Sequence, residues 1–351
     1  MADKKDTLII LSPGFPANEA DTTCLPAHQV FVRALHKNFP ALNIIIVAFQ
    51  YPFTAHEYTW HGVKVISFNG GAKRKLRRLL LWYKIWQALK KLHTTQSIKG
   101  LLSFWVTDCA LVGKRFGKKY NLPHYAWITG QDAKSDNNLI KFIRPGANEV
   151  FAMSDFLARQ FYNNHHVMPV TVIPNGIDTE LFGTEPKLRS IDILAAGSLI
   201  PLKQYDVFIE VVKLIHHKMP QIKAMQCGKG PLQQQLQALI QRYSLENNLA
   251  LAGEKAHTEV LALMQQSKIF LHTSNYEGFS TVCLEALYAG AHVISFFRPM
   301  EIDIEHWHIV DTKEAMAAKA LELLLSPITN YTPVLVYSMD NIARQVIGLY
   351  K

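Results

Sequence analysis

Two glutamates in one short segment have the residue type and the spacing to bind a phosphorylated ligand. Glu277 precedes a predicted helix over 280–289, and Glu285 stands eight residues later, inside that helix. A helix N-terminus offers unpaired backbone N–H groups and a positive dipole end to phosphate. One acid before this phosphate seat and one behind it can contact the two ends of a single ligand. A nucleotide diphospho-sugar has this layout, with a sugar, two phosphates and a ribose in line.

Two other loops carry residues of a suitable kind. Lys203 ends the loop 197–203, where its side chain can reach phosphate oxygens over a helix N-terminus. Gly228 and Gly230 allow close approach of the backbone, and Pro231 suits the first turn of a helix. Each loop alone is more typical of a plain connecting turn. Together, at one edge of one sheet, the three loops predict a single binding site.

The elements that must position these loops alternate between strand and helix patterns, which predicts parallel sheets with crossover helices. The predicted strands are 7–11, 43–48, 63–68, 100–106, 124–128, 150–152, 171–173, 191–196, 224–226, 249–252, 269–273 and 292–296. The predicted helices are 28–37, 110–119, 205–217, 232–243, 259–266, 280–289, 313–325 and 339–350. The sequence therefore predicts an α/β protein with two doubly wound, Rossmann-like halves.

The length of 351 residues suits two domains better than one. A turn-rich break at 174–178 separates the two alternating patterns. We therefore expect one domain over 1–173 and a second over 174–336. Folds of this kind bind ligands beyond the carboxyl ends of their strands, so a ligand held by both domains would lie in a central cleft.

Four segments of the second half, 172–178, 196–203, 227–231 and 277–285, resemble the family-four retaining glycosyltransferases, which have the GT-B fold. The last segment resembles the paired-glutamate signature of that family. The resemblance covers about residues 150–295 and is loose in the first half. It implies a first domain that binds the acceptor and a second that binds the nucleotide-sugar. It also implies that a C-terminal helix, about 337–351, returns to the first domain.

The resemblance implies a role for each matched residue. Glu277 would lie against the donor sugar and stabilise the charged transition state, and Lys203 would neutralise the leaving diphosphate. Glu285 would accept hydrogen bonds from the ribose. With Lys203 and a helix dipole in these roles, no metal and no other cofactor is expected. The other expected donor contacts are Gly14, Ser198, Gly228, Gly230, Gly278, Phe279 and Ser280.

The sequence departs from the family pattern at three places. Ser198 stands where the family commonly has an arginine, so Lys203 carries more of the phosphate charge. The His-Gly-x-Asp-like segment of the family is replaced by Thr129-Gly130-Gln131-Asp132. Either Asp132 or Thr129 would then have to supply the side chain that contacts the sugar. We assign this catalytic contact to Asp132. The N-terminal glycine-rich loop is altered as well, with Gly14 retained as a candidate contact.

The basic residues are concentrated in the first half. Residues 1–172 hold 22 Lys and Arg against 10 Asp and Glu, and the rest hold 15 against 18. Segment 73–91 is the densest stretch, with basic residues, leucines and two tryptophans. It is typical either of a helix on an anionic membrane surface or of a crossover helix whose apolar side packs on the sheet. Nucleic-acid binding is disfavoured because no recognition motif accompanies the charge.

These observations predict a hexosyltransferase-like, metal-independent, retaining glycosyltransferase. It would move a sugar from a UDP- or GDP-sugar to a hydroxyl acceptor, such as a sugar or a lipid-linked glycan, in cell-envelope or exopolysaccharide assembly. The alternative is a non-catalytic nucleotide-sugar-binding or membrane-surface accessory protein. The four scattered cysteines form no disulfide framework, and no signal segment or membrane span is recognisable. We therefore expect a cytoplasmic protein, peripheral on the inner face of a membrane if segment 73–91 binds lipid.

Overall fold

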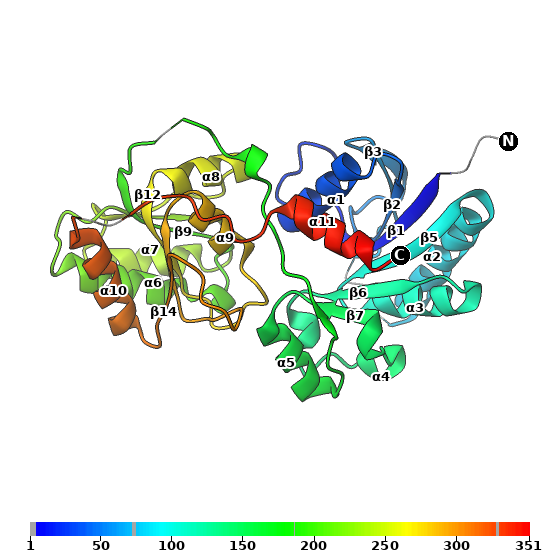
Figure 1. Ribbon diagram of the computed structural model, residues 1–351. Helices are drawn as coiled ribbons and strands as arrows, with labels where there is room; N and C mark the ends of the chain where they lie inside the picture. The colour runs from blue at the N-terminus through cyan, green and yellow to red at the C-terminus, as the bar shows by residue number, and fades with distance from the viewer. Residues whose placement is uncertain (1–4, 72–74, 186, 328–329) are drawn as a thin grey trace. The chain divides into compact units, whose positions relative to one another are not determined.

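The computed structural model describes residues 5–71, 75–185, 187–327 and 330–351 (Figure 1). The chain divides into two compact units. The first consists of Met1–Gly176 and Met339–Lys351, and the second of Ile177–Ser338. Each unit is built around its own sheet, which confirms the predicted α/β architecture.

The sheet of the first unit has eight strands in the order β3-β4-β2-β1-β5-β6-β7-β8. All neighbours pair in parallel except β3 and β4. The central strands are buried on both faces, as their apolar sequences predict. The bounds are β1 Asp6–Gly14, β2 Asn43–Tyr51, β3 Glu57–Trp60, β4 Val63–Ser67, β5 Ser97–Phe104, β6 His124–Ile128, β7 Val150–Ala152 and β8 Thr171–Val172.

Helices cover both faces of this sheet. Successive side chains of a strand point to opposite faces, and Ile9 and Leu11 of β1 pack in one cluster with α2 and α3. Phe31 of α1 packs instead against Phe104 and Trp127. The helices are α1 Pro26–Asn38, α2 Lys75–Thr95, α3 Asp108–Tyr120, α4 Ile140–Ile143 and α5 Asp155–His165.

The basic segment 73–91 falls largely on α2, and its first two residues lie outside the described residues. Leu81, Ile85 and Leu89 of this helix are buried against the sheet. This confirms the crossover-helix interpretation for that side of α2. Leu79, Leu80 and Tyr83 are each more than half exposed on the other side, so α2 also presents apolar groups to solvent.

The last helix, α11 (Met339–Gly348), packs with the first unit. Asn38 of α1 donates to Asp340 of α11 at 2.7 Å and accepts from Arg344 at 3.1 Å. Beyond the helix, the Tyr350 hydroxyl donates to the carbonyl of Leu101 at 2.7 Å. The C-terminus is therefore attached to the sheet of the first unit by side-chain contacts as well as by packing.

The second unit has a six-stranded, fully parallel sheet in the order β11-β10-β9-β12-β13-β14. Helices α6, α7 and α10 share one apolar cluster with β9, β12 and β13, and α8 and α9 contact strands of the same sheet. The strands are β9 Ile191–Ala196, β10 Ala224–Cys227, β11 Leu249–Leu251, β12 Ser267–His272, β13 His292–Ser295 and β14 Trp307–Ile309. The helices are α6 Tyr205–His216, α7 Gln233–Arg242, α8 His257–Gln265, α9 Thr281–Tyr288 and α10 Lys313–Leu325.

Several elements differ from the sequence predictions. Strands β3 and β14 lie at sheet edges and are too short to give a clear alternating pattern. Helix α5 was not predicted either; it begins after Ser154, whose hydroxyl accepts a hydrogen bond from the Leu157 N–H. Strand β5 ends at Phe104 rather than at Val106, because Trp105 adopts a left-handed backbone with φ of 65°.

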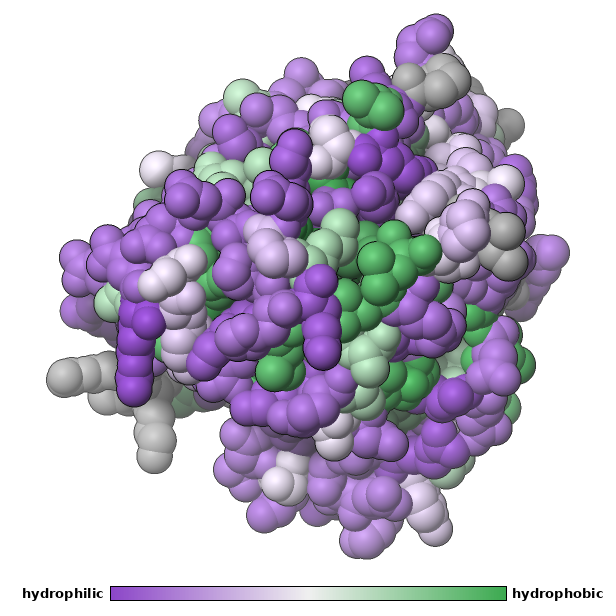
Figure 2. Space-filling view, turned by 90° about the vertical axis from the view of Figure 1, so that its left-hand side faces the viewer, coloured by the Kyte–Doolittle hydropathy of each residue, from purple (hydrophilic) through white to green (hydrophobic). Residues whose placement is uncertain are grey.

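The surface is mostly hydrophilic on the face seen in Figure 2, with apolar groups gathered in a few places. Exposed apolar side chains of the second unit include Ile302, Leu325 and Leu335. Among the described residues, no helix is long and apolar enough to cross a membrane.

Candidate active site

Glu277 lies at the centre of a charged cluster at the carboxyl end of β12. Its Oε2 atom is 2.5 Å from Nζ of Lys203 and 3.3 Å from Nε2 of His272. Lys203 and Glu277 are each about one-fifth exposed, and His272 is almost fully buried. The structure thus brings together the two predicted catalytic residues of this unit and adds a histidine.

Backbone contacts fix the loop that carries Lys203. This residue ends a short 3-10 turn, Pro201–Lys203, between β9 and α6. The Thr273 hydroxyl donates to the Lys203 carbonyl at 2.8 Å, and the Asn275 N–H donates to the Leu202 carbonyl at 3.2 Å. Thr273 and Asn275 closely follow β12. Their contacts therefore join the loop after β9, which carries Lys203, to the loop after β12, which carries Glu277.

The electrostatics of the cluster keep Glu277 ionised. Burial alone would raise the pKa of the carboxyl group. The nearby His272, with Nε2 3.3 Å from the carboxylate, and the positive charge of Lys203 oppose this effect and lower the pKa of Glu277 to about 2. Burial also lowers the pKa of His272. The site therefore holds a carboxylate that accepts hydrogen bonds and stabilises positive charge, rather than an acid that donates a proton.

Glu285 forms a second acid–histidine pair. Its Oε1 atom lies 2.7 Å from Nε2 of His257, the first residue of α8. Both side chains are largely buried. Burial lowers the pKa of His257, but the hydrogen bond and charge of Glu285, with a contribution from Asp178, raise it overall. The helix acid is therefore an inward-facing group rather than a solvated one.

The N-terminus of α9 follows Glu277 directly. Ser280 occupies the N-cap position, and its side chain makes no capping hydrogen bond. Gly278, Phe279 and Ser280 are all buried in the turn that leads into the helix. The Phe279 ring packs near Trp307 and Tyr337, which anchors the turn. The N-terminus of α9, which is the positive end of its dipole, therefore lies in the same loop as Glu277.

The two glycines after β10 serve close packing between loops. A Cβ atom on Gly228 would lie 2.0 Å from the Gly197 carbonyl oxygen, and one on Gly230 would lie 2.5 Å from that of Leu199. The Leu199 N–H donates to the Lys229 carbonyl at 3.0 Å, so the two loops are also hydrogen-bonded. The sequence predicted close approach of the backbone here. The structure supplies a partner, the loop that contains the exposed Ser198.

We expect Gly228→Ala to destabilise the second unit by about 2–4 kcal/mol, from overpacking and from strain at a positive φ. The φ of Gly228 is 142°. Urea unfolding of the purified protein measures this loss. Gly253→Ala is the matched control, because Gly253 has φ of 72° with no atom within 4 Å of the added Cβ; it should cost only about 1 kcal/mol. Equal losses of unfolding free energy in the two variants would show that the contact between the two loops does not require glycine at position 228.

The remaining predicted residues, Gly14 and Asp132, belong to the first unit. Gly14 ends β1, where it pairs with Tyr51. Asp132 is buried, and its carboxylate accepts hydrogen bonds from the N–H groups of Val106, Thr129 and Gly130 at 2.8–3.2 Å. Burial raises the pKa of Asp132 to about 6 despite these bonds. In this arrangement the carboxylate holds the loop together, and its contact with a sugar stays a prediction.

Sequence reasoning missed the two histidines. Neither His257 nor His272 lies in a metal-binding pattern, and His257 stands far from its partner in the sequence. His272 is the next-to-last residue of the predicted strand 269–273, and His257 lies in the loop before the predicted helix 259–266. Their places at the carboxyl edge of the sheet are the signal that could have identified them.

Residues 177–331 match the family model described as "Glycosyl transferases group 1". This match covers almost the whole second unit, including both acid–histidine pairs. The second unit is therefore similar to the glycosyl transferases group 1 family. The match does not extend into the first unit.

Curated relatives of this chain align over only part of their own length. The gpi3 subunit of phosphatidylinositol N-acetylglucosaminyltransferase from Schizosaccharomyces pombe is 30% identical over 203 residues, which are 56% of this chain and 44% of the relative. The GPI3 subunit of the enzyme of the same name from Saccharomyces cerevisiae is 26% identical over 161 residues, 43% of this chain and 36% of the relative. This chain thus spans less than half the length of these relatives.

Solved structures resemble both units, and the likeness establishes the GT-B fold. Sucrose-phosphate synthase from Thermosynechococcus elongatus has a TM-score of 0.75 at 17% identity, with 98% of each chain covered. HepE of Anabaena, solved with UDP and glucose, has a TM-score of 0.70 at 17% identity, with the same coverage. The predicted fold, with two doubly wound Rossmann-like domains, is confirmed.

Proposed function

We propose that this protein is a retaining glycosyltransferase that uses a UDP- or GDP-sugar as donor. The observation that carries the proposal is the ordered set of Lys203, Glu277 and Glu285 along one edge of the group 1 unit. Lys203 and Glu277 meet at 2.5 Å beside the N-terminus of α9, and Glu285 lies on that helix with His257. A donor laid along this edge has its sugar at Glu277, its diphosphate at Lys203 and the helix end, and its ribose at Glu285.

The proposed reaction exchanges one bond at the anomeric carbon of the donor sugar. The bond from this carbon to the distal phosphate oxygen breaks, and its electron pair leaves with the diphosphate. The acceptor hydroxyl oxygen forms the new bond on the same face, and its proton passes to the leaving phosphate oxygen. Lys203 and the helix dipole stabilise the charge that develops on the diphosphate. Glu277 stays ionised and stabilises the positive charge on the sugar ring. These residues supply the stabilisation without a metal.

The relatives narrow the choice of donor for a first test. Several are named for transfer of N-acetylglucosamine, including a 2-deoxystreptamine N-acetyl-D-glucosaminyltransferase from Niallia circulans that is 25% identical over 179 residues. HepE is a structure solved with UDP. We therefore place UDP-N-acetylglucosamine first among candidate donors. The acceptor is a hydroxyl compound, and cell-envelope or exopolysaccharide assembly remains the proposed setting.

The activity test measures nucleotide release from a panel of UDP- and GDP-sugars in the presence of EDTA. The expected result is release of UDP or GDP that depends on the donor and rises with acceptor, with no loss in EDTA. Anomeric configuration of the product, read by NMR, should equal that of the donor. Donor binding without turnover across a wide acceptor panel would instead favour an accessory nucleotide-sugar-binding protein.

We also propose that α2 touches an anionic membrane surface. The exposed apolar side chains Leu79, Leu80 and Tyr83 lie on a helix that also carries the exposed basic residues Arg77, Lys90 and Lys91. This combination suits the headgroup region of a bilayer. Such contact would keep the protein peripheral on the inner face of the membrane, beside a lipid-linked acceptor.

Co-sedimentation with vesicles tests this contact. Leu79→Ser with Leu80→Ser is expected to weaken binding to phosphatidylserine vesicles about tenfold, because two apolar side chains no longer enter the interface. Leu188→Ser is the control, since Leu188 is 86% exposed in the second unit. Equal binding by the wild type and the double variant would remove α2 from the contact.

A further inference from the structure

A cavity of about 560 Å³ lies within the first unit, between α4 and the C-terminal end of α5. Figure 1 shows these two helices side by side below β7. The volume is in the range of small-molecule sites. Four of the described lining residues are basic, namely Lys141, Arg144, His165 and His166. The proposed glycosyl transfer uses none of these four side chains.

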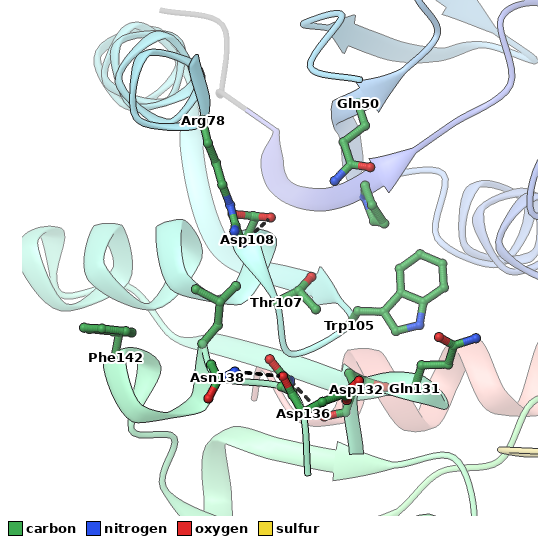
Figure 3. Close-up of a pocket in the computed structure, with 13 residues that line it drawn as sticks. Gln50, Arg78, Trp105, Thr107, Asp108, Gln131, Asp132, Asp136, Asn138 and Phe142 are labelled. Atoms are coloured by element: carbon green, nitrogen blue, oxygen red, sulfur yellow. Dashed lines mark hydrogen bonds and ion pairs between the residues drawn. The ribbon is translucent and has the colours of Figure 1, made fainter. Parts of the chain in front are cut away.

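This cavity differs in charge from the larger cavity beside it. The larger one has a volume of about 770 Å³, and Asn137 lines both. Figure 3 shows the larger cavity with the acids Asp108, Asp132 and Asp136 in its lining. None of the described residues that line the smaller cavity is acidic. The basic residues of the smaller cavity therefore form a separate group that favours an anion.

The two cations on the α4 side are available to a ligand. Lys141 and Arg144 are exposed, and neither forms an ion pair with the residues that the structure describes. The Arg144 Nε atom donates only to the carbonyl of Lys141, at 3.3 Å. Glu149, an acid of the same loop, is engaged by Lys114 at 2.6 Å and by the Gly146 N–H at 2.6 Å. The charges of Lys141 and Arg144 are therefore not neutralised by this acid.

The two histidines on the α5 side can supply further donors. Nε2 of His165 lies 3.0 Å from the Lys134 carbonyl, to which it must donate, so Nδ1 is the nitrogen that gains a second proton. Burial lowers the pKa of His165, the Lys134 carbonyl opposes this, and the charge of His166 lowers the pKa further. A bound anion would offset the repulsion between the two rings and favour their protonated forms.

Helix dipoles explain only part of this arrangement. Basic residues suit the C-terminus of α5, where His165 and His166 lie, because that end of a helix dipole is negative. Helix α4 has only four residues, so a dipole gives no comparable reason for Lys141 and Arg144. These two cations are the part of the cluster that a ligand accounts for best.

Exposed apolar side chains surround the cavity in the sequence. They follow or precede its lining residues closely and are Phe142, Tyr162, Met168 and Val170. A basic cavity beside exposed apolar groups suits a phospholipid, with its headgroup inside and its chains outside. The cavity by itself suits a small free phosphate ester equally well.

We infer that this cavity binds a phosphate ester group, held by Lys141 and Arg144 with His165 and His166 as further donors. A phosphate ester has several terminal oxygens and carries up to two negative charges, so it can engage more of these cations at once than a carboxylate can. The group belongs either to a small free ester or to a phospholipid headgroup. The inference does not depend on the proposed transferase activity, because the donor edge at α9 belongs to the other unit.

NMR titration of the full chain with glycerol 3-phosphate tests the site, with glycerol as the uncharged control. The ring resonances of His165 and His166 should shift with glycerol 3-phosphate, whereas those of His217, exposed in the second unit, should not. The double variant Lys141→Gln, Arg144→Gln should bind at least tenfold more weakly, because charge-assisted hydrogen bonds are lost. Arg33→Gln, at an exposed position of α1, is the matched control and should bind within twofold of the wild type.

Co-sedimentation with phosphatidylcholine vesicles, with and without phosphatidic acid, distinguishes the two sources, because phosphatidic acid is the diacyl form of glycerol 3-phosphate. This arm uses the Leu79→Ser, Leu80→Ser background, so that α2 does not mask the effect. Binding to phosphatidic acid that falls at least tenfold in the double variant assigns the site to a headgroup. Binding of glycerol 3-phosphate alone that falls in this way assigns it to a free ester.

Three results would overturn the inference. The first is that neither glycerol 3-phosphate nor phosphatidic acid binds. The second is that both bind the double variant as tightly as they bind the Arg33→Gln control. The third is that glycerol binds as tightly as glycerol 3-phosphate. All the substituted residues are exposed, so loss of binding in these variants does not reflect loss of the fold, and urea unfolding checks this.

Discussion

Replacing Lys203 by alanine is expected to lower kcat about 10²–10³-fold, the usual effect of removing one group that stabilises developing negative charge. Lys203 Nζ is the cation that lies 2.5 Å from Glu277 at the end of α9 where we place the diphosphate. Its interaction strengthens as the diphosphate leaves, so kcat should fall more than nucleotide affinity. Steady-state kinetics with the best donor, together with calorimetric titration of UDP or GDP, separate these two quantities.

Lys313→Ala is the matched control for this variant. Lys313 also forms a 2.5 Å pair, with Glu210, but the pair lies on the surface of α10 and α6. Its loss should leave kcat within about twofold of the wild type, because exposed ion pairs contribute little. A Lys203→Ala enzyme with wild-type kcat would remove Lys203 from catalysis, whatever its effect on stability.

Replacing Glu285 by alanine is expected to weaken nucleotide binding about 10–100-fold, since charge-assisted hydrogen bonds to a ribose are worth about 1.5–3 kcal/mol. The buried pair with His257, at 2.7 Å, holds the Glu285 carboxylate in place. His257→Gln should therefore weaken nucleotide binding less than Glu285→Ala does. Calorimetry with UDP and GDP measures both effects. Glu314→Ala, an exposed acid on α10, serves as control, and unchanged affinity in Glu285→Ala would remove its ribose role.

The same pair gives stability a dependence on pH. The pKa of His257 is raised in the folded protein above its ordinary value of 6.5. A group with a raised folded pKa stabilises the protein below its unfolded pKa, and this contribution is lost as pH rises through the folded pKa. The wild type should therefore exceed His257→Gln in stability by more at about pH 6 than at about pH 9. Urea unfolding at the two pH values measures the difference, and an equal gap at both would contradict a charged His257.

The periodicity of the sequence predicted most of the fold, because buried parallel strands such as β9 are continuous apolar runs. Periodicity did not predict very short strands, or element ends that depend on an unusual backbone conformation. Strand β14 has three residues and pairs at an edge. The end of β5 depends on the left-handed backbone of Trp105, which no hydrophobic pattern announces. Residues in such conformations are recognised only after folding has fixed them.

The candidate site was predicted in part. Loop position was enough to group Lys203, Glu277 and Glu285, since the ends of parallel strands meet at one edge. The partners of the acids, His272 and His257, come from other elements and depend on tertiary packing. For Asp132, residue type suggested chemistry, and the structure adds that its buried carboxylate accepts hydrogen bonds from three backbone N–H groups, while its contact with a sugar stays a prediction. Residue type alone cannot distinguish an acid that serves a ligand from one that serves the chain.

Calorimetric titration of the full chain with UDP and with GDP, in EDTA, tests the central claim most directly. The account predicts that at least one of them binds with a dissociation constant in the micromolar range, about −8 kcal/mol, and that Glu285→Ala weakens this binding. Failure of both nucleotides to bind the wild-type protein would contradict the assignment of the α9 edge as a donor site.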